Sequence, residues 1–269
     1  MTDDQSLGLG GPGGEEMPAH AYNRRAEVEE ILRADQTLLG RVYHYDLQGL
    51  NPAQIAEAEG NATVGFVDSY RTQIKALLDG DVPSSPNIAL QSARRIRKWL
   101  RTESLSDELH TDLLALESLL MSRAGDATAQ IEEIQTAVRA TESAEASGTP
   151  GIYVYTLPHY LRHPFDPETG RTLLKVGHSS TDAYYRAGSQ GRLTALPEDP
   201  ILLRIYPVAE SATAERDFHG WLKDADHSGA RTRRGGSEWF VTSTKFLDRI
   251  ARSKGLDVIA VTEFEAGDE

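Results

Sequence analysis

The stretch Gly151-Ile152-Tyr153-Val154-Tyr155-Thr156-Leu157 decides the fold of the C-terminal part of the chain. Its residues alternate and are rich in β-branched and aromatic types, which predicts a strand. A second strand is predicted at Thr172-Leu173-Leu174-Lys175-Val176-Gly177. The polar segment between them, residues 158–170, would join the two strands as a hairpin with a long loop, which starts an antiparallel sheet.

The residues after this hairpin predict a small α+β domain. Ser211 is the expected cap of a helix, and Gly255 is the expected end of another. Strands are predicted at residues 201–208, 237–241 and 257–264, and helices at the start of 183–196, at 212–224 and at 244–254.

The N-terminal part has a different pattern. Residues 1–20 are Gly-rich and polar, so we expect a disordered tail. Residues 21–147 show helical spacing of apolar residues and predict an all-helical domain. Its later helices are expected at about 87–101, 105–121 (with Ser106 as cap) and 127–141. Residues 142–150 lose the periodicity and predict a linker, with the domain boundary near residue 147 and the second domain at 150–269. The predicted fold class is therefore α+β: a helical domain, then a central, mainly antiparallel sheet flanked by helices.

Residues 50–60 resemble the first half of a helix-turn-helix, with Pro52 at the first position of a short helix and a turn at Gly60. The helix after the turn, with Thr63 as its expected cap, would serve as the recognition helix. It would present Thr63, Asp68, Ser69, Arg71 and Gln73 to DNA. An ordinary helical hairpin is the alternative.

The composition limits the class of protein and the kinds of metal or redox site that the chain can contain. The chain has 269 residues, 39% of them hydrophobic and 26% charged, which is typical of a soluble globular protein. No apolar run approaches the roughly 18 residues of a membrane span, and the acidic, Gly-rich start lacks the features of a signal peptide. A cytoplasmic location is expected. The absence of cysteine excludes disulfides, thiolate zinc sites and cysteine nucleophiles. A bound metal would have oxygen or imidazole ligands, which favours Mg²⁺ or Mn²⁺.

Charge is distributed unevenly. The net charge of −13 opposes DNA binding, because neutralisation of phosphates supplies most non-specific affinity. Residues 151–269 hold 15 Lys and Arg against 17 Asp and Glu, so most of the acidity lies in the N-terminal part. Local basic clusters would therefore contact phosphates, and an ordinary solvated surface is the alternative. The expected clusters are Arg94, Arg97 and Lys98 on one helix, and Arg231, Arg233 and Arg234 in a Gly-rich loop.

Five motifs in the C-terminal part occur in a recognisable order. They are Gly151-Ile152-Tyr153, Lys175-Val176-Gly177, Tyr185-Arg186, the helix segment Ala214-Glu215-Arg216-Asp217-Phe218-His219, and Ser237-Glu238-Trp239-Phe240. This set resembles the GIY-YIG nucleases, in particular the phage-type branch, over about 115 residues. The resemblance implies an endonuclease that hydrolyses DNA phosphodiester bonds with one Mg²⁺ or Mn²⁺. Restriction, phage defence and mobile-element biology are the settings that it implies.

The resemblance also implies roles for single residues. Tyr153 would activate or orient the attacking water, and Arg186 would stabilise the phosphorane-like transition state. Glu215 would hold the metal. His219, one turn later on the same helix, matches a histidine common in this branch.

The second motif departs from the usual family pattern, because Lys175 stands where a tyrosine is usual. Lysine does occur there in the phage-type branch. Lys175 could relay a proton only with a strongly lowered pKa; otherwise it binds phosphate as a point charge. The general base is therefore left open between Tyr153 and Lys175. Further candidates are Glu238 as a second metal ligand and Tyr155 and His178 as substrate contacts, while Gly177 indicates special backbone geometry or close approach.

Two other functions fit the same residues. One is a DNA-binding module of this fold that does not cleave, which the lysine of the second motif and the acidic net charge favour. The other is a protein-interaction adaptor, which the acidic helical domain favours. The helical domain would position DNA in the nuclease, or bind a protein partner. The sequence sets no oligomeric state.

Overall fold

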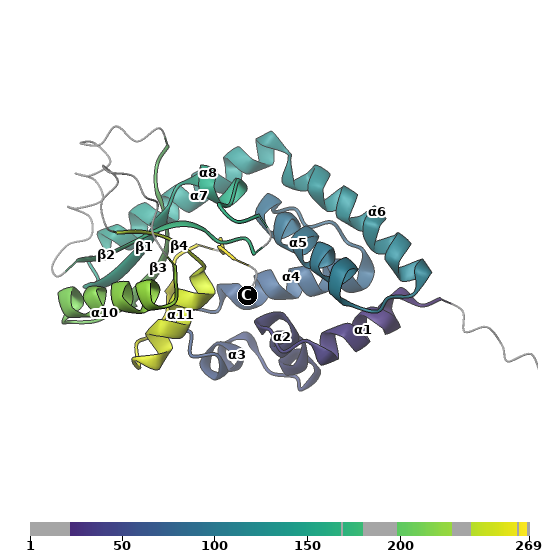
Figure 1. Cartoon of the computed structure of the whole chain (residues 1–269), viewed down its shortest axis with the longest axis horizontal. Coiled ribbons are helices and arrows are strands. Elements are labelled where there is room, and N and C mark those ends of the chain that lie inside the picture. Colours follow the sequence, from purple (N-terminus) through teal and green to yellow (C-terminus); the bar gives the residue numbers. More distant parts are fainter. Residues whose placement is uncertain (1–21, 168, 180–197, 228–237, 263, 268–269) are drawn as a thin grey trace, which may run out of the picture.

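The computed structural model describes residues 22–167, 169–179, 198–227, 238–262 and 264–267. The chain has an α+β fold, in which a helical region precedes a sheet that is interleaved with helices (Figure 1). The expected N-terminal tail and the expected helix at 183–196 lie outside the described residues. Among the described residues, no helix has the length and apolar character that crossing a bilayer would require.

The helical region is built around its fourth helix. Buried side chains from α4 meet those of the neighbouring helices in one core, which includes Leu32, Val42, Leu77, Ile96 and Leu113. The region comprises α1 (Arg24–Ala34), α2 (Leu38–Leu47), α3 (Pro52–Ala58), α4 (Gly65–Asp79), α5 (Pro86–Thr102), α6 (Asp107–Ala124) and α7 (Ala127–Ala146).

The central position of α4 overturns part of the helix-turn-helix prediction. Ser69 and Gln73, expected to point toward DNA, are 8% and 3% exposed. The Gln73 side chain donates to Gln91 of α5 at 2.8 Å. Arg71 forms an ion pair with Asp46 of α2 at 2.6 Å. Ser69 and Gln73 therefore cannot contact a DNA groove, whereas Asp68 is exposed and Arg71 is partly exposed.

The described strands form one sheet with the order β4-β2-β1-β3-β5, and every pairing in it is antiparallel. This arrangement confirms the expected mainly antiparallel sheet. The strands are β1 (Gly151–Thr156), β2 (Thr172–Ser179), β3 (Ile201–Pro207), β4 (Trp239–Thr242) and β5 (Ile259–Ala260), and the helices are α8 (Pro158–Arg162), α10 (Ser211–Asp224) and α11 (Thr244–Ser253).

Alternation along β1 separates the two faces of the sheet. Ile152 and Val154 pack with apolar side chains of α10 and α11, such as Phe218 and Leu247. Tyr153 packs on the opposite face, beside Leu202 and Ile205 of β3 and Ala144 of α7. The tyrosine face and the α10 face are therefore different sides of the same strand.

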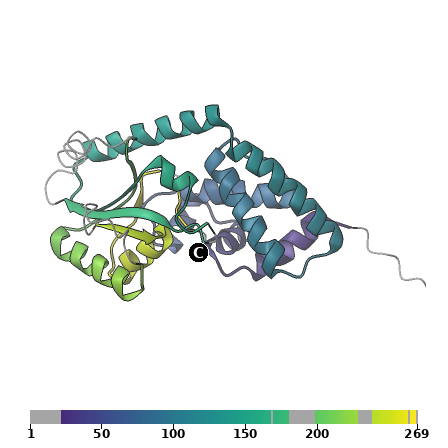
Figure 2. The same ribbon diagram turned by 45° about the horizontal axis from the view of Figure 1, so that its top comes forward.

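Helix α7 joins the two regions, and in Figure 2 it extends from the helical region across the sheet. It continues to Ala146, so residues 142–146 are helical and their prediction as linker was wrong. The backbone N–H of Leu202 donates to Thr141 at 2.9 Å, and Tyr155 donates to Glu145 at 2.9 Å. These contacts to the sheet hold the last turns of α7 in place, which local sequence periodicity could not reveal.

The C-terminal strand is shorter than predicted. Residues 257–264 were expected to form a strand, but β5 covers only Ile259–Ala260. The backbone nearby binds the helical region instead, because Val258 accepts from Ala62 N and Ala260 N donates to the Thr63 hydroxyl. Thr63 therefore does not cap α4, whose N-cap is Val64.

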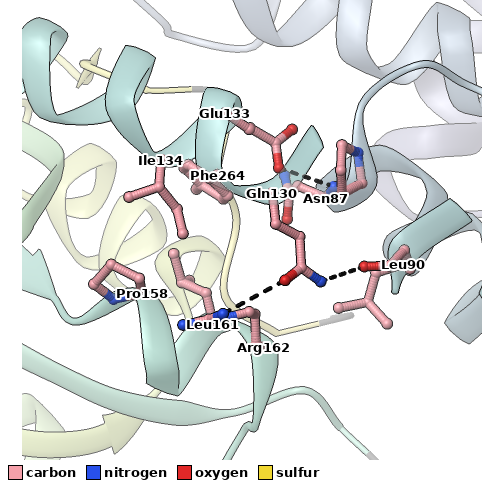
Figure 3. Close-up of a pocket in the computed structure, with 11 residues that line it drawn as sticks. Asn87, Leu90, Gln130, Glu133, Ile134, Pro158, Leu161, Arg162 and Phe264 are labelled. Carbon is pink, nitrogen blue, oxygen red and sulfur yellow. Dashed lines mark hydrogen bonds between the residues drawn. The ribbon is translucent and has the colours of Figure 1, made fainter. Parts of the chain in front are cut away.

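A small cavity marks the junction between α5, α7 and α8 (Figure 3). It measures about 30 Å³ and is lined mainly by apolar side chains, including Leu161 and Phe264. Gln130 of α7 approaches Arg162 of α8 at 3.4 Å. Glu133 accepts from the backbone of Asn87 at 3.2 Å. The cavity is thus a packing gap between the helical region and the sheet.

Candidate active site

The sheet brings the motif residues of β1 and β2 to one face, because residues directly opposite each other in an antiparallel pair share a face. Tyr155 lies opposite Lys175, and Tyr153 lies opposite Gly177. On its other side, Lys175 lies opposite Trp239 of β4. The rings of the two tyrosines stack with centroids 6.3 Å apart. The first two motifs and the tryptophan of the last motif therefore adjoin one another.

The carboxylate of Glu215 lies beside Gly177, although α10 packs on the opposite face of the sheet. A Cβ atom on Gly177 would stand 3.9 Å from Glu215 Oε1, at ordinary van der Waals distance. The pairing of β4 with β2 ends at Lys175, so Gly177 lies beyond the end of that edge strand. Glu215 therefore reaches the strand position opposite Tyr153, beyond the end of the edge strand.

His178 lies beside the Glu215 carboxylate, on the face of the sheet that α10 covers. The distance between His178 Nε2 and Glu215 Oε2 is 3.6 Å, and both side chains are mostly buried. The second ring nitrogen of His178 forms a 3.1 Å hydrogen bond with the Ser211 hydroxyl. Ser211 is the first residue of α10, whose N-cap is Glu210, so its prediction as the cap was wrong. Its hydroxyl orients the histidine instead.

Lys175 has an acidic partner from the last motif. Its Nζ lies 3.3 Å from Glu238 Oε2, with 23% and 41% of the respective side chains exposed. An ammonium within an apolar strand is costly without such a partner. The ion pair is partly exposed, Glu238 more so than Lys175. The structure thus links two motifs that are 63 residues apart in sequence, Lys175 and Glu238.

The two tyrosine hydroxyls have partners at the C-terminal end of α7. Tyr153 donates to the backbone carbonyl of Thr149, and Tyr155 donates to Glu145 at 2.9 Å. Burial and the adjacent Glu145 raise the pKa of Tyr155, so its phenol is neutral. Tyr155 therefore fastens β1 to α7, and its role as a substrate contact stays a prediction. Tyr153 is 3% exposed, so its expected contact with the attacking water stays a prediction.

His219 supports the site from within α10. Its Nε2 donates to the carbonyl of Val176 at 2.9 Å. Its ring lies 4.8 Å from that of Phe240. His219 thus fixes α10 to β2 directly next to Gly177, one helical turn from Glu215. These contacts position Glu215, while a direct part in the chemistry stays a prediction.

Several predicted residues cannot be placed. Arg186, the expected transition-state arginine, lies outside the described residues. The loop arginines Arg231, Arg233 and Arg234 lie there as well. The five other catalytic and metal candidates lie on or beside β1 and β2, together with His178; they are Tyr153, Lys175, Glu215, His219 and Glu238.

The basic stretch of α5 divides between two environments. Arg97 faces α6, where it forms an ion pair with Glu117 at 2.6 Å. Arg94 and Lys98 instead line a pocket with Lys245 of α11. Sequence reasoning missed Lys245, since nothing in the local pattern connects residues so far apart. The three expected phosphate contacts therefore do not form a single surface.

The residues present fit a metal site with a single protein carboxylate. Within the part of the chain that the structure describes, no group of three or more Asp, Glu and His could hold an ion. Mg²⁺ commonly binds through one or two carboxylates and completes its shell with water and substrate phosphate. Glu215 is the candidate for this mode, because it is a carboxylate with 16% of its side chain exposed and its Oε1 atom lies next to the strand position of Gly177. Glu238 is paired with Lys175 and stays a prediction as second ligand.

Comparison with known proteins adds no independent assignment. No family model, no curated protein and no solved structure matches the chain. The features of the chain that indicate a function are therefore the order of its five motifs and the contacts between the described side chains of those motifs.

Proposed function

We propose that the chain is a metal-dependent endonuclease that hydrolyses phosphodiester bonds of DNA. The observation that carries the proposal is the position of Glu215, which reaches the glycine opposite Tyr153. A carboxylate from a helix and a phenol from a strand are thereby offered to the same neighbourhood. Lys175 adds a positive charge on the adjoining row of the sheet. A metal-binding carboxylate, a group that orients water and a positive charge near the phosphate each assist phosphodiester hydrolysis.

Each residue has a role that its contacts support. Glu215 binds the divalent cation, held in orientation by His178, which is in turn held by Ser211. When bound, the cation neutralises charge on the phosphate and assists departure of the leaving oxygen. The Tyr153 oxygen accepts a hydrogen bond from the attacking water and so orients it. Lys175 binds a phosphate oxygen as a point charge, exchanging part of its interaction with Glu238.

The role of Arg186 in this proposal, stabilisation of the transition state, comes only from the resemblance of its motif. A guanidinium remains charged and can bind two phosphate oxygens at once, which suits a transition state with spread negative charge. The helical region would position the duplex, or bind a protein partner.

A non-cleaving DNA-binding module is the second candidate. The Tyr153 hydroxyl already donates to the Thr149 carbonyl, and Lys175 is already paired with Glu238. Both contacts are also compatible with a domain that has this fold but does not cleave DNA. Such a module would retain DNA without ever nicking it.

Incubation of the purified protein with supercoiled plasmid, in Mg²⁺, in Mn²⁺ and in chelator, tests the proposal. We expect nicking with either metal and none with chelator. Glu215→Gln keeps the size of the side chain but removes its charge, and should lower the rate on the order of 100-fold or more while preserving DNA binding. Glu210→Gln is the matched control, an exposed glutamate at the N-cap of the same helix. Wild-type protein that binds plasmid but never nicks it would favour the module.

A further inference from the structure

A second basic site lies at the junction of α4, α5 and α11. Four cationic side chains line a pocket there: Arg94, Arg95 and Lys98 from α5, and Lys245 from α11. Gln73 of α4 and Gln91 of α5 also line it. The lining residues within the described part of the chain include no Asp or Glu, so the pocket offers donors and positive charge, which suits an anion.

Several side chains that line this pocket are held in place by other residues of the protein. Arg95 and Gln73 are 7% and 3% exposed, so two polar side chains are held inside the protein. Lys245 stands 5.6 Å from the centre of the Tyr70 ring and 3.8 Å from Glu265. Arg95 lies 3.9 Å from Asp35. Because these groups are fixed by partners behind the pocket, little side-chain entropy would be lost when an anion binds.

One amide donor at the pocket has no partner. Gln73 donates to Gln91 Oε1 at 2.8 Å, which orients the Gln91 amide. The Nε2 atom of Gln91 is buried and has no hydrogen-bond partner among the described residues. A buried donor without an acceptor costs free energy, on the order of 1–3 kcal/mol. Because Gln91 lines the pocket, we infer that an oxygen atom bound there would accept from this donor.

The size of the pocket limits what can enter. Its cavity volume is about 10 Å³, roughly the space of one water-sized oxygen. A whole nucleotide, sugar or base does not fit. A phosphate presented from outside can insert one oxygen and leave the rest of its group at the rim, beside exposed Lys98.

We propose that this pocket binds one phosphate of the DNA backbone, several base pairs from the bond that is cut. The proposal deepens the proposed function and rests on it for the identity of the ligand. Strand β4 runs from Trp239, opposite Lys175, to Thr242, and Lys245 follows three residues later. Strand β4 is about 10 Å long, at about 3.3 Å per residue, and Lys245 lies beyond its end in the first turn of α11. The length of β4 corresponds to about three base pairs of a duplex.

Binding of a labelled duplex in chelator, measured by fluorescence anisotropy over a series of salt concentrations, tests the pocket without cleavage. Lys98→Gln and Arg94→Gln should each weaken binding several-fold and reduce the slope of log affinity against log salt by about one. Arg97→Gln is the matched control, because it removes the same charge from the same helix but on the side of Glu117. It should change affinity less than about twofold.

A second arm uses inorganic phosphate as competitor against chloride at equal ionic strength. In wild-type protein phosphate should displace the duplex more effectively than chloride, and the Arg94→Gln/Lys98→Gln variant should lose this preference. If the Arg94, Lys98 and Arg97 substitutions lower duplex affinity equally, the pocket is not a phosphate site. Affinity would then depend only on the net charge of the protein. Thermal unfolding of each variant verifies that it is folded.

The two proposals fail in different ways. If plasmid is never nicked but the pocket substitutions weaken duplex binding, the nuclease fails and the phosphate pocket stands. If nicking depends on Glu215 but the pocket substitutions leave duplex affinity unchanged, the proposed phosphate site is wrong and the proposed nuclease activity stands.

Discussion

The hydroxyl of Tyr70 in α4 donates to the carboxylate of Glu265 at 2.9 Å, across 195 residues of sequence. Glu265 also lies 3.4 Å from Arg204 of β3 and 3.8 Å from Lys245 of α11. Arg204 is 3% exposed and pairs with Asp248 as well. Because a helix of the N-terminal region, the sheet and the C-terminal segment share this one carboxylate, the two parts of the chain are fixed together by a buried polar network.

Tyr70→Phe should destabilise the protein by about 1–3 kcal/mol, because it leaves the buried carboxylate of Glu265 short of one donor. Burial, and next the charge of Glu265, raise the pKa of Tyr70, so the phenol is a neutral donor throughout the working pH range. The expected fall in melting temperature is about 2–4 °C per kcal/mol for a chain of this size. Tyr45→Phe is the control, since Tyr45 is less buried than Tyr70 and its acceptor Glu59 keeps both hydrogen bonds from Arg41. Equal losses for both variants would contradict a special role for the junction.

Glu145→Gln should make the protein more stable at neutral pH than wild type, with a difference that shrinks toward acid. The pKa of Glu145 lies above the ordinary value of 4.5, and burial of the carboxyl group is the largest cause. The hydrogen bond that Tyr155 donates lowers this pKa, but by less. The folded state therefore binds an extra proton at pH values between the ordinary and the raised pKa. Wild-type stability falls as pH rises through that window, whereas glutamine carries no charge to bury and still accepts from Tyr155.

Urea unfolding between about pH 4 and pH 8 measures this difference in free energy of unfolding. Glu132→Gln, an exposed glutamate of the same helix, is the control and should give a flat difference. A constant difference for Glu145→Gln across the whole range would exclude burial of the charge as the cause.

Two glycines of the sheet should respond differently to alanine. A Cβ atom on Gly151 would overlap with the backbone carbonyl of Tyr206 in β3, so Gly151→Ala should cost about 1–3 kcal/mol. Gly177→Ala meets only Glu215 Oε1 at 3.9 Å and should fold with nearly unchanged stability. Under the proposed function it should nevertheless slow nicking, because a methyl group enters the space beside the metal-binding carboxylate. Thermal melts and plasmid nicking of both variants distinguish the two effects; unimpaired nicking by Gly177→Ala would weigh against this geometry.

Lys175→Gln should lower cleavage far more than stability. Its ion pair with Glu238 is partly exposed, and such pairs contribute about 0–1 kcal/mol. Loss of a phosphate contact should reduce the salt dependence of duplex binding by about one unit of slope. Lys254→Gln, which removes an ion pair with Asp217 at 2.6 Å in the same region, is the control. Similar cleavage by both variants would remove Lys175 from the proposed site.

Local sequence signals were sufficient for elements that are stabilised by their own residues. Pro52 begins α3 as expected, with Asn51 as its cap, and Ser106 caps α6 by accepting from Leu109. Strand β1 was predictable because its alternation and residue types need no partner to be recognised. Predictions went wrong where a distant segment competes for the same backbone group. Thr63 was expected to cap a helix, yet its hydroxyl accepts from Ala260.

The sequence alone determined the α+β class, the identity and order of the motifs, and the residue types available for phosphate chemistry. Only the tertiary structure decided which of them meet. It placed Glu215 next to Gly177, paired Lys175 with Glu238, and separated Arg97 from Arg94 and Lys98. The physical reason is the distance along the chain over which each effect acts. Propensity, capping and alternation depend on a few neighbouring residues, so the sequence shows them. Cross-strand register and helix packing join segments that are far apart in the chain, and local sequence does not show which segments will meet.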